Sequence, residues 1–209
     1  NGNYAYIDTI NEARKVLVEQ MSGTLVTIAK DVKIQVEFNP TRAQAYRLIG
    51  YENRILAAED FNDDTKDAGE IGAGHTVTAL YEVVPVGVEM ELPGVDPLRY
   101  QETVEPSAAA ASGELMTLKL RYKQPDGDTS AKLEFPIRDG DASYAQASND
   151  FKFAASVAMF GMLLRDSPYR GTSTFSGVLE LADEGRGADR HGYRAEFLQL
   201  VAKAAVLAR

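Results

Sequence analysis

Three neighbouring stretches decide the fold class. They are Met116-Thr-Leu-Lys-Leu-Arg-Tyr-Lys123, Pro125-Asp-Gly-Asp128 and Lys132-Leu-Glu-Phe-Pro-Ile137. Apolar and polar residues alternate on both sides of the Pro-Asp-Gly-Asp sequence, which is typical of two strands with one buried face. Glycine tolerates the positive φ of a tight turn, so we expect Gly127 to close a β-hairpin. Pro136 cannot donate a hydrogen bond to a neighbouring strand, which places the second strand at a sheet edge.

The same alternation recurs elsewhere in the first two thirds of the chain. Residues 32–38 alternate apolar side chains with Lys33, Gln35 and Glu37, which predicts one dry face and one wet face. Residues 46–48 and 77–83 continue the pattern. About six antiparallel strands with one polar face predict a β-sandwich, which we assign to residues 24–142.

The last part of the chain, residues 143–209, reads as a helical subdomain packed on the sandwich. Ser148 can cap a helix over residues 149–165, which is apolar almost all round and should be the most buried element, with Val157 and Phe160 at its centre. A second helix spans residues 174–184, and Asp189 can cap a third. The fold class we expect is therefore α+β.

The first 23 residues look different from the rest. Residues 4–7 resemble the end of a strand, and Thr9 with Glu12 forms a capping-box pattern at a helix start. Ile10, Ala13, Leu17 and Met21 then recur at helical spacing, up to a stop at residues 22–23. One helix cannot bury its own apolar stripe, so we expect this piece to pack on another domain.

Composition narrows the class of partner. The chain has 209 residues, 22 of them basic and 31 acidic, for a formal net charge of −9. Such an acidic chain is a poor candidate for binding nucleic acid or anionic membranes. It contains no cysteine, which excludes disulfides and thiolate metal sites and fits both a cytosolic and an envelope location. Its most apolar run, residues 153–164, is shorter than the ~20 residues that span a bilayer.

Three ordered stretches carry a family resemblance. They are Tyr46-Arg-Leu-Ile-Gly-Tyr-Glu-Asn-Arg54, Asp67-Ala-Gly-Glu-Ile-Gly-Ala-Gly-His-Thr-Val-Thr-Ala-Leu-Tyr-Glu82 and Phe151-Lys-Phe-Ala-Ala-Ser-Val-Ala-Met-Phe-Gly-Met-Leu-Leu-Arg165. Together they resemble the C-terminal region of bacterial von Willebrand factor type A (VWA) proteins of the YfbK kind, an uncharacterised domain. The resemblance covers nearly the whole chain.

The resemblance implies that a VWA domain precedes this region in the same chain. Residues 1–23 would then be the last strand end and helix of that domain, and the chain would be part of a longer protein. The VWA metal site, of the Asp-x-Ser-x-Ser type, would lie upstream, and Asp139-Gly-Asp-Ala-Ser143 does not match it. No catalytic residue carries over from the family. The resemblance also implies a location at the cell envelope, periplasmic or extracellular.

The acidic segment 59–70 is the sharpest local chemical feature. Its six carboxylates are oxygen ligands of the kind that Ca²⁺ prefers, and Asp60, Asp63, Asp64 and Asp67 are the candidate metal ligands. The spacing fails the helix–loop–helix calcium pattern, because it lacks the turn glycine and the distal bidentate glutamate. We therefore favour a solvated loop between strands over a calcium site.

The most distinctive run, residues 46–54, offers a candidate partner surface made of Arg47, Tyr51, Glu52, Asn53 and Arg54. Tyrosine and arginine dominate binding hot spots, but the same residues also suit a structural polar network. We favour the structural interpretation and keep a partner surface as the alternative.

Two other features receive structural interpretations. Gly69, Gly72 and Gly74 precede a strand pattern rather than a helix, so a bulge or bend is favoured over a phosphate loop. His75 and His191 have no nucleophile at a recognisable motif, so neither is expected to be catalytic.

These observations favour a non-catalytic protein-interaction or scaffolding module without a cofactor. Its expected partners are the upstream VWA domain and an unidentified protein. The alternative is a metal-dependent hydrolase or a Ca²⁺-binding adhesion domain, which clustered titratable groups with perturbed pKa values in a cleft would favour.

Overall fold

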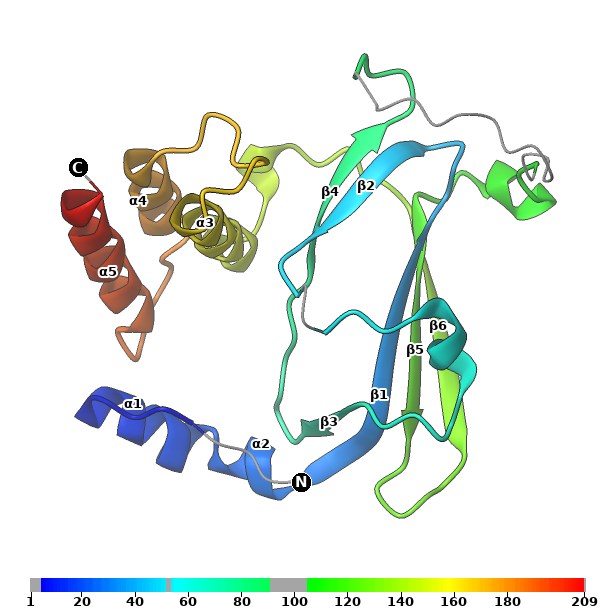
Figure 1. Cartoon of the computed structure of the whole chain (residues 1–209), viewed down its shortest axis with the longest axis horizontal. Helices are drawn as coiled ribbons and strands as arrows, with labels where there is room; N and C mark the ends of the chain where they lie inside the picture. Colours follow the sequence, from blue (N-terminus) through cyan, green and yellow to red (C-terminus); the bar gives the residue numbers. More distant parts are fainter. Residues whose placement is uncertain (1–4, 52–53, 91–104, 209) are drawn as a thin grey trace. The chain divides into compact units, whose positions relative to one another are not determined.

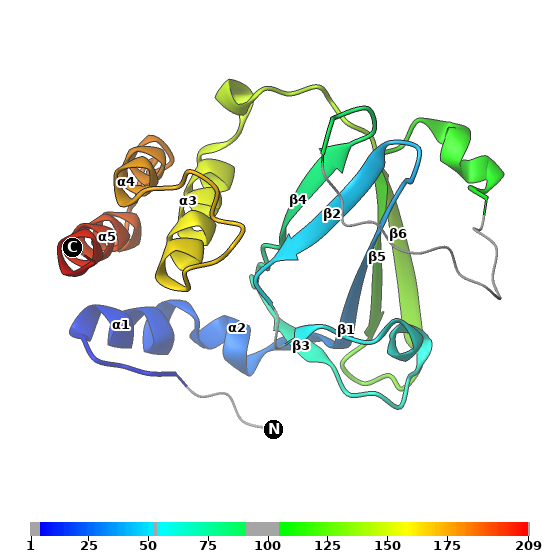
Figure 2. The same cartoon turned by 45° about the horizontal axis from the view of Figure 1, so that its top comes forward.

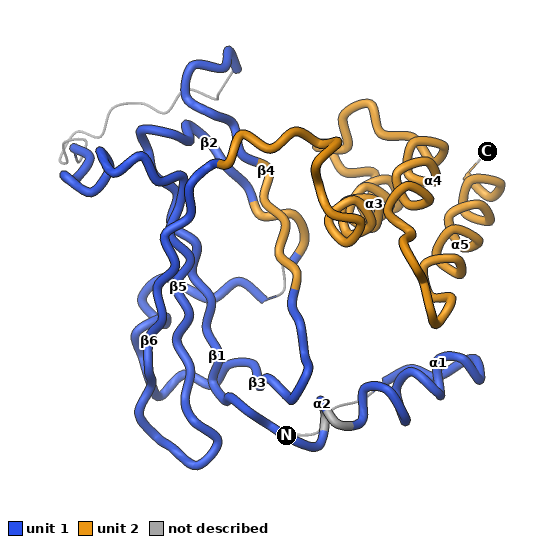
Figure 3. Tube along the Cα trace, turned by 180° about the vertical axis from the view of Figure 1, so that it is seen from behind, with its two compact units in different colours: residues 1–47, 51–77, 83–139 blue, residues 48–50, 78–82, 140–209 orange. Residues whose placement is uncertain are grey.

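The structure, a computed structural model, describes residues 5–51, 54–90 and 105–208. Antiparallel sheets occupy the first two thirds of the chain and helices its C-terminal part, which confirms the mixed helix-and-sheet class (Figure 1). The chain forms two compact units (Figure 3). The first contains residues 1–47, 51–77 and 83–139, and the second contains residues 48–50, 78–82 and 140–209.

The predicted hairpin forms the centre of the first unit. Strand β5 (Met116–Lys123) pairs antiparallel with β6 (Ser130–Ile137), and Met116 lies opposite Ile137. The connection differs from the expected tight turn. It spans residues 124–129, the Gly127 amide donates to the Gln124 carbonyl oxygen at 3.0 Å, and Gly127 does not have a positive φ.

The sheet has the strand order β3-β1-β5-β6, so β6 is an edge strand, as Pro136 indicated. The carbonyl of Ile137 accepts a hydrogen bond from the amide of Leu115 at 2.8 Å. Backbone groups of successive residues point to opposite sides of a strand, so the nitrogen of Pro136 faces the open edge. Its missing N–H therefore weakens no bond of the sheet and discourages a further strand from pairing.

One face of this sheet is apolar in three aligned rows that run across β1 (Thr27–Phe38), β5 and β6. The rows are Ile34–Leu120–Leu133, Val36–Leu118–Phe135 and Phe38–Met116–Ile137. Ile34, Leu133 and Phe135 keep 42–45% of their surface exposed. The face is therefore apolar across β1, β5 and β6, and it is exposed at Ile34 on β1 and at Leu133 and Phe135 on β6.

The opposite face is wet only in part: Glu37 and Glu134 are exposed as expected, but two lysines are not. Lys33 on β1 is only 3% exposed, and Lys123 on β5 is 9% exposed. The segment that follows β2 returns over this face, and its short 3₁₀ turn (Ala58–Asn62) contacts β1. Alternation in one strand cannot reveal that a distant loop covers its polar side.

Strand β3 (Gly69–Gly72) pairs with β1 through two register shifts, and Gly74 lies in the turn that follows with a φ of 77°, so the glycine run forms an irregular strand and a bend rather than a phosphate loop. A Cβ atom at Gly72 would collide with the backbone of Gly23, which explains why only glycine fits there. Strands β2 (Ala43–Ile49) and β4 (Leu80–Pro85) form a separate two-stranded sheet. The rings of Phe38 on β1 and Tyr46 on β2 lie 4.4 Å apart between centroids.

The second unit contains the three expected C-terminal helices, α3 (Asn149–Leu164), α4 (Phe175–Glu184) and α5 (Tyr193–Leu207). Ser148 caps α3 and Thr174 caps α4, as their positions indicated. The cap of α5 differs, because Gly192 occupies the N-cap position with a φ of 75°. Asp189 still accepts hydrogen bonds from two amides of the first turn, those of Arg194 and Ala195.

Each of these helices contributes one residue to the central hydrophobic cluster. Phe160, Val178 and Val201 are 7%, 0% and 0% exposed, respectively. The rings of Phe160 and Phe197 meet edge to face with centroids 5.5 Å apart. Four residues of α3 are buried, but the expectation that Val157 belongs to its buried centre is wrong, because Val157 is 43% exposed.

The N-terminal helical segment consists of α1 (Ile10–Arg14), a π-helical turn (Lys15–Glu19) and α2 (Met21–Leu25). The chain passes from α2 directly into β1 (Figure 2), two residues beyond the expected stop. Thr9 accepts a hydrogen bond from the Glu12 amide at 3.1 Å, as the capping pattern predicted. Ile10, Leu17 and Met21 are 81%, 59% and 49% exposed, so the apolar stripe lies open.

Across the described part of the chain, every helix is too short or too polar to cross a lipid bilayer.

Candidate functional site

The acidic segment 59–70 is fastened to the polar face of the first unit's sheet by two buried lysines. The Nζ atom of Lys33 donates to the carbonyl oxygens of Asp60, at 3.1 Å, and Asp63. The Nζ atom of Lys123 donates to the carbonyl oxygen of Asp64 at 2.8 Å. The lysines thus hold the loop by its main chain. These contacts neutralise the buried charge of the lysines only in part, and they leave the loop carboxylates for other contacts.

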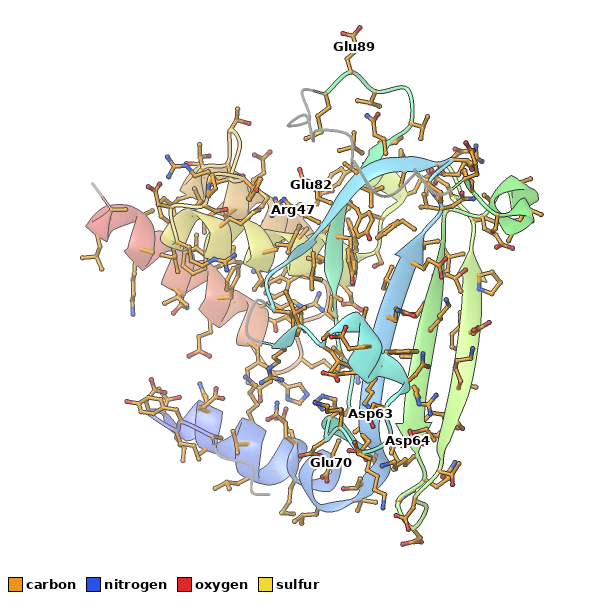
Figure 4. The ribbon with its side chains drawn as sticks, turned by 45° about the vertical axis from the view of Figure 1, so that its right-hand side comes forward. Arg47, Asp63, Asp64, Glu70, Glu82 and Glu89 are labelled. Carbon is orange, nitrogen blue, oxygen red and sulfur yellow. The ribbon has the colours of Figure 1, made fainter. Side chains whose placement is uncertain are left out.

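Asp64 is the hub of these other contacts, and Figure 4 shows it with Asp63 beside β1 and β5. Its Oδ1 atom accepts hydrogen bonds from the Ser130 hydroxyl at 2.5 Å and from Arg121 Nη2 at 3.0 Å. The Ser130 hydroxyl, followed by the Arg121 guanidinium, lowers the pKa of Asp64 to about 2. The carboxylate therefore stays ionised and joins the loop to β5 and β6.

Asp31 completes the attachment at a bulge in β1. Its carboxylate accepts hydrogen bonds from Lys123 Nζ at 2.6 Å and from the Ala68 amide at 3.2 Å. The hydrogen bond between Asp31 and Lys123 lowers the pKa of Asp31 and raises the pKa of Lys123. Asp31 has a φ of 51°, a strained conformation for a residue with a Cβ atom, and its two contacts stabilise it.

The four candidate calcium ligands face different partners. The Asp60 carboxylate lies 3.5 Å from Lys66 Nζ, and the Asp63 carboxylate caps the loop by accepting from the amide and hydroxyl of Thr65. The Asp64 carboxylate binds Ser130 and Arg121, as above, whereas that of Asp67 interacts with Asp31. Within the described ranges, no three His, Cys, Asp or Glu side chains converge in a way that could hold a metal ion.

The candidate partner surface is brought together only in part. Arg47 lies on β2 (Figure 4), and Tyr51 follows that strand with a φ of 62° and 41% of its surface exposed. The amide of Arg54 donates to the Tyr51 carbonyl oxygen at 2.8 Å. Glu52 and Asn53 lie outside the described residues.

A buried lysine also joins two helices of the second unit. Lys152 on α3 is 7% exposed, and its Nζ atom donates to Glu184 of α4 at 2.5 Å. The Tyr144 hydroxyl donates to the other oxygen of Glu184 at 2.6 Å, which raises the pKa of Tyr144 to about 12. A tyrosine held protonated and a lysine held in an ion pair fasten helices together and are poorly placed to exchange protons.

The second unit also contains a pocket of about 530 Å³ between the start of α3 and the loop from α4 to α5. Arg194 builds one wall. Its guanidinium donates to the Gly185 carbonyl oxygen at 2.6 Å, pairs with the Asp150 carboxylate and lies 4.8 Å from the Phe153 ring centroid. Burial acts to raise the pKa of Asp189, but the two α5 amides that it accepts and the charges of Arg194 and Arg186 together lower this pKa.

This pocket was not foreseen from the sequence. The sequence signal for this pocket is the recurrence of arginine at every fourth position, at Arg186, Arg190 and Arg194. The start of the last helix lies within this segment and had to be inferred. Of the two histidines of the chain, His191 lines the pocket and stacks on Tyr193 with ring centroids 5.7 Å apart. His75 is exposed in the first unit, and its amide donates to the Gly72 carbonyl oxygen.

Comparison with known proteins identifies the family. Residues 23–207 match the family described as "Uncharacterized protein YfbK, C-terminal". A curated relative from Escherichia coli (strain K12), described as "Uncharacterized protein YfbK", is 43% identical over 201 residues, which are 96% of this chain and 34% of the relative. The chain thus spans about a third of that relative's length. No solved structure matches. The chain belongs to the family of YfbK C-terminal domains.

Proposed function

We propose that this chain is a non-catalytic protein-interaction module of a longer bacterial VWA-domain protein. The observation that carries the proposal is the apolar face of the β1–β5–β6 sheet. Three cross-strand rows are apolar there, and Ile34, Leu133 and Phe135 are 42–45% exposed. Contiguous exposed apolar surface of this kind marks a place where another protein binds.

The use of the buried charges supports a module without catalysis. Lys33, Lys123 and Lys152 are each at most 9% exposed, and each donates to oxygens that fasten a loop or helix in place. An active site would instead bring such groups together at a cavity with pKa values near the working pH. The pKa of Asp64, at about 2, and that of Tyr144, at about 12, are displaced away from that range.

The finer fold assignments belong to the same proposal. The Phe38–Tyr46 contact supports a sandwich in which the β2–β4 sheet packs on β1. The open stripe of α1 supports the idea that residues 1–23 pack on a preceding VWA domain, and the family match begins at residue 23. A boundary near residue 142 remains a prediction. The family resemblance supports a location at the cell envelope.

The alternative function, a metal-dependent hydrolase or a Ca²⁺-binding adhesion domain, has less support. Coordination of Ca²⁺ by Asp63 and Asp64 would have to displace Thr65, Ser130 and Arg121 from their carboxylates. Calcium takes six to eight oxygen ligands, so it would also have to draw Asp60 away from Lys66 and rearrange the loop.

Site-specific photocross-linking tests the interaction face. We would place benzoylphenylalanine at Phe135, on the apolar face, or at Glu134, the next residue on the opposite face, in the full-length protein in its native cells. We expect adducts to another protein from position 135 and none of the same mass from position 134. The same adducts from both positions, or none from position 135, would contradict the proposal.

A further inference from the structure

The pocket of the second unit has the size of a ligand site and an unusual local charge. Its volume, about 530 Å³, lies within the roughly 300–1,000 Å³ of typical ligand pockets. Segment 186–194 contains three arginines and one histidine against a single aspartate, in a chain whose formal net charge is −9. Local cations in an acidic chain call for a specific explanation.

The two acidic residues of the pocket are already used inside the fold. Asp150 pairs with Arg194, and Asp189 accepts the amides of Arg194 and Ala195. Asp150 therefore compensates neither of the remaining arginines of the lining, whereas Asp189 interacts with Arg186 through its charge.

Those remaining arginines are Arg186 and Arg190, and both are exposed. Arg186 is loosely paired with Asp183, with 3.7 Å between Nε and Oδ1. Among the described residues, Arg190 has no ion-pair or hydrogen-bond partner for its guanidinium. The pocket thus carries one guanidinium group without such a partner, that of Arg190, and one that is only loosely paired, that of Arg186; guanidinium groups bind carboxylates in a bidentate manner.

We propose that this pocket binds an acidic segment of a partner protein through Arg186 and Arg190. The inference rests on the proposed interaction function and names the chemistry of one partner. The stacked rings of His191 and Tyr193 supply a flat wall for the aliphatic part of a glutamate side chain. Screening limits charge effects to about 8 Å at physiological ionic strength, so a ligand in the pocket interacts mainly with the charges that line it.

The choice of an acidic protein segment over a nucleic acid follows from the same charges. A nucleic acid carries a phosphate at every step, and the formal net charge of −9 of the whole chain disfavours such an extended polyanion. A short acidic segment needs to place only one or two carboxylates, which matches the guanidinium groups of Arg186 and Arg190.

Binding of a fluorescent hexaglutamate peptide to the whole chain, measured by anisotropy at physiological salt, tests the proposal. We expect the double variant Arg186→Gln/Arg190→Gln to bind at least about tenfold more weakly, because two charge-assisted contacts are lost. The matched control, Arg170→Gln/Lys203→Gln, removes the same charge from exposed positions outside the pocket and should change affinity less than about twofold, as expected for screened charges.

Three results would overturn the proposal. They are an absence of peptide binding, an equal loss in the control variant, and displacement of the peptide by an equal concentration of inorganic phosphate, which would indicate a small-anion site. Thermal melts of both variants verify that they fold. Cross-linking from position 135 reports the proposed function separately, because its sheet face contains neither arginine.

Discussion

Replacement of Gly185 by alanine tests how closely α3 and α4 approach. Gly185 follows α4 with φ −82° and ψ 0°, a conformation that alanine adopts without strain. By itself, the smaller entropy of the unfolded chain would stabilise Gly185→Ala by about 0.4–1 kcal/mol. However, a Cβ atom at this position would lie 2.5 Å from the amide nitrogen of Phe153 and 2.9 Å from the carbonyl oxygen of Asn149.

These are backbone atoms of α3, which cannot rotate away, so the two helices must separate. Such overpacking costs about 1–3 kcal/mol, and the shortness of both distances favours the upper half of that range. The net expectation is a loss of about 2 kcal/mol in the free energy of unfolding.

The matched control is Gly161→Ala in the interior of α3, where a Cβ atom would have nothing within 4 Å. Relief of the helix cost of glycine should stabilise this variant by about 0.5–1 kcal/mol. Urea unfolding followed by circular dichroism at 222 nm measures both variants. A Gly185→Ala protein as stable as the wild type would refute the close approach of the helices.

Three further predictions follow from the two units. The pKa of Asp64 is lowered to about 2 from an ordinary 3.8, so its contribution to stability is present above about pH 4 and disappears as the pH falls towards 2. Urea midpoints at pH 5 and pH 3 should show this loss in the wild type. The Asp64→Asn variant should show much less of it. Phe160→Asp should unfold the helical unit, because a buried unpaired charge costs several kcal/mol. Val157→Asp should melt close to the wild type, since Val157 is half exposed. Equal melting temperatures of the two variants would count against the described core. Millimolar Ca²⁺ should leave the melting temperature unchanged relative to chelator, and a rise of several degrees that disappears in Asp63→Asn/Asp64→Asn would reveal a calcium site.

Local signals in the sequence predicted the elements whose determinants are close together in the chain. Ser148 and Thr174 each bond an amide three residues away, and the hairpin joins strands separated by six residues. Pro136 indicated an edge because its effect depends on its own nitrogen alone. Such features are readable because a short segment contains all the interacting atoms.

The candidate site depended on contacts between distant residues. Lys33 and Asp60 are 27 residues apart, and Lys123 and Asp31 are 92 residues apart, so no window on the sequence shows that these lysines are buried. The pocket likewise combines the start of α3 with a loop some 40 residues later. Alternation predicts which side of a strand a lysine occupies, but tertiary structure decides whether water reaches it.

The attachment of the acidic loop by its carbonyl oxygens has a consequence for how its sequence can drift. Lys33 binds the main chain of Asp60 and Asp63, and every residue type offers the same carbonyl oxygen. Mutations at position 60 can therefore accumulate at little cost to the anchor, whereas loss of either lysine would remove a main-chain anchor and leave the segment to the contacts of Asp64 and Asp31. The same asymmetry makes this loop a suitable place to graft a foreign epitope, provided that both lysines and the backbone path are kept.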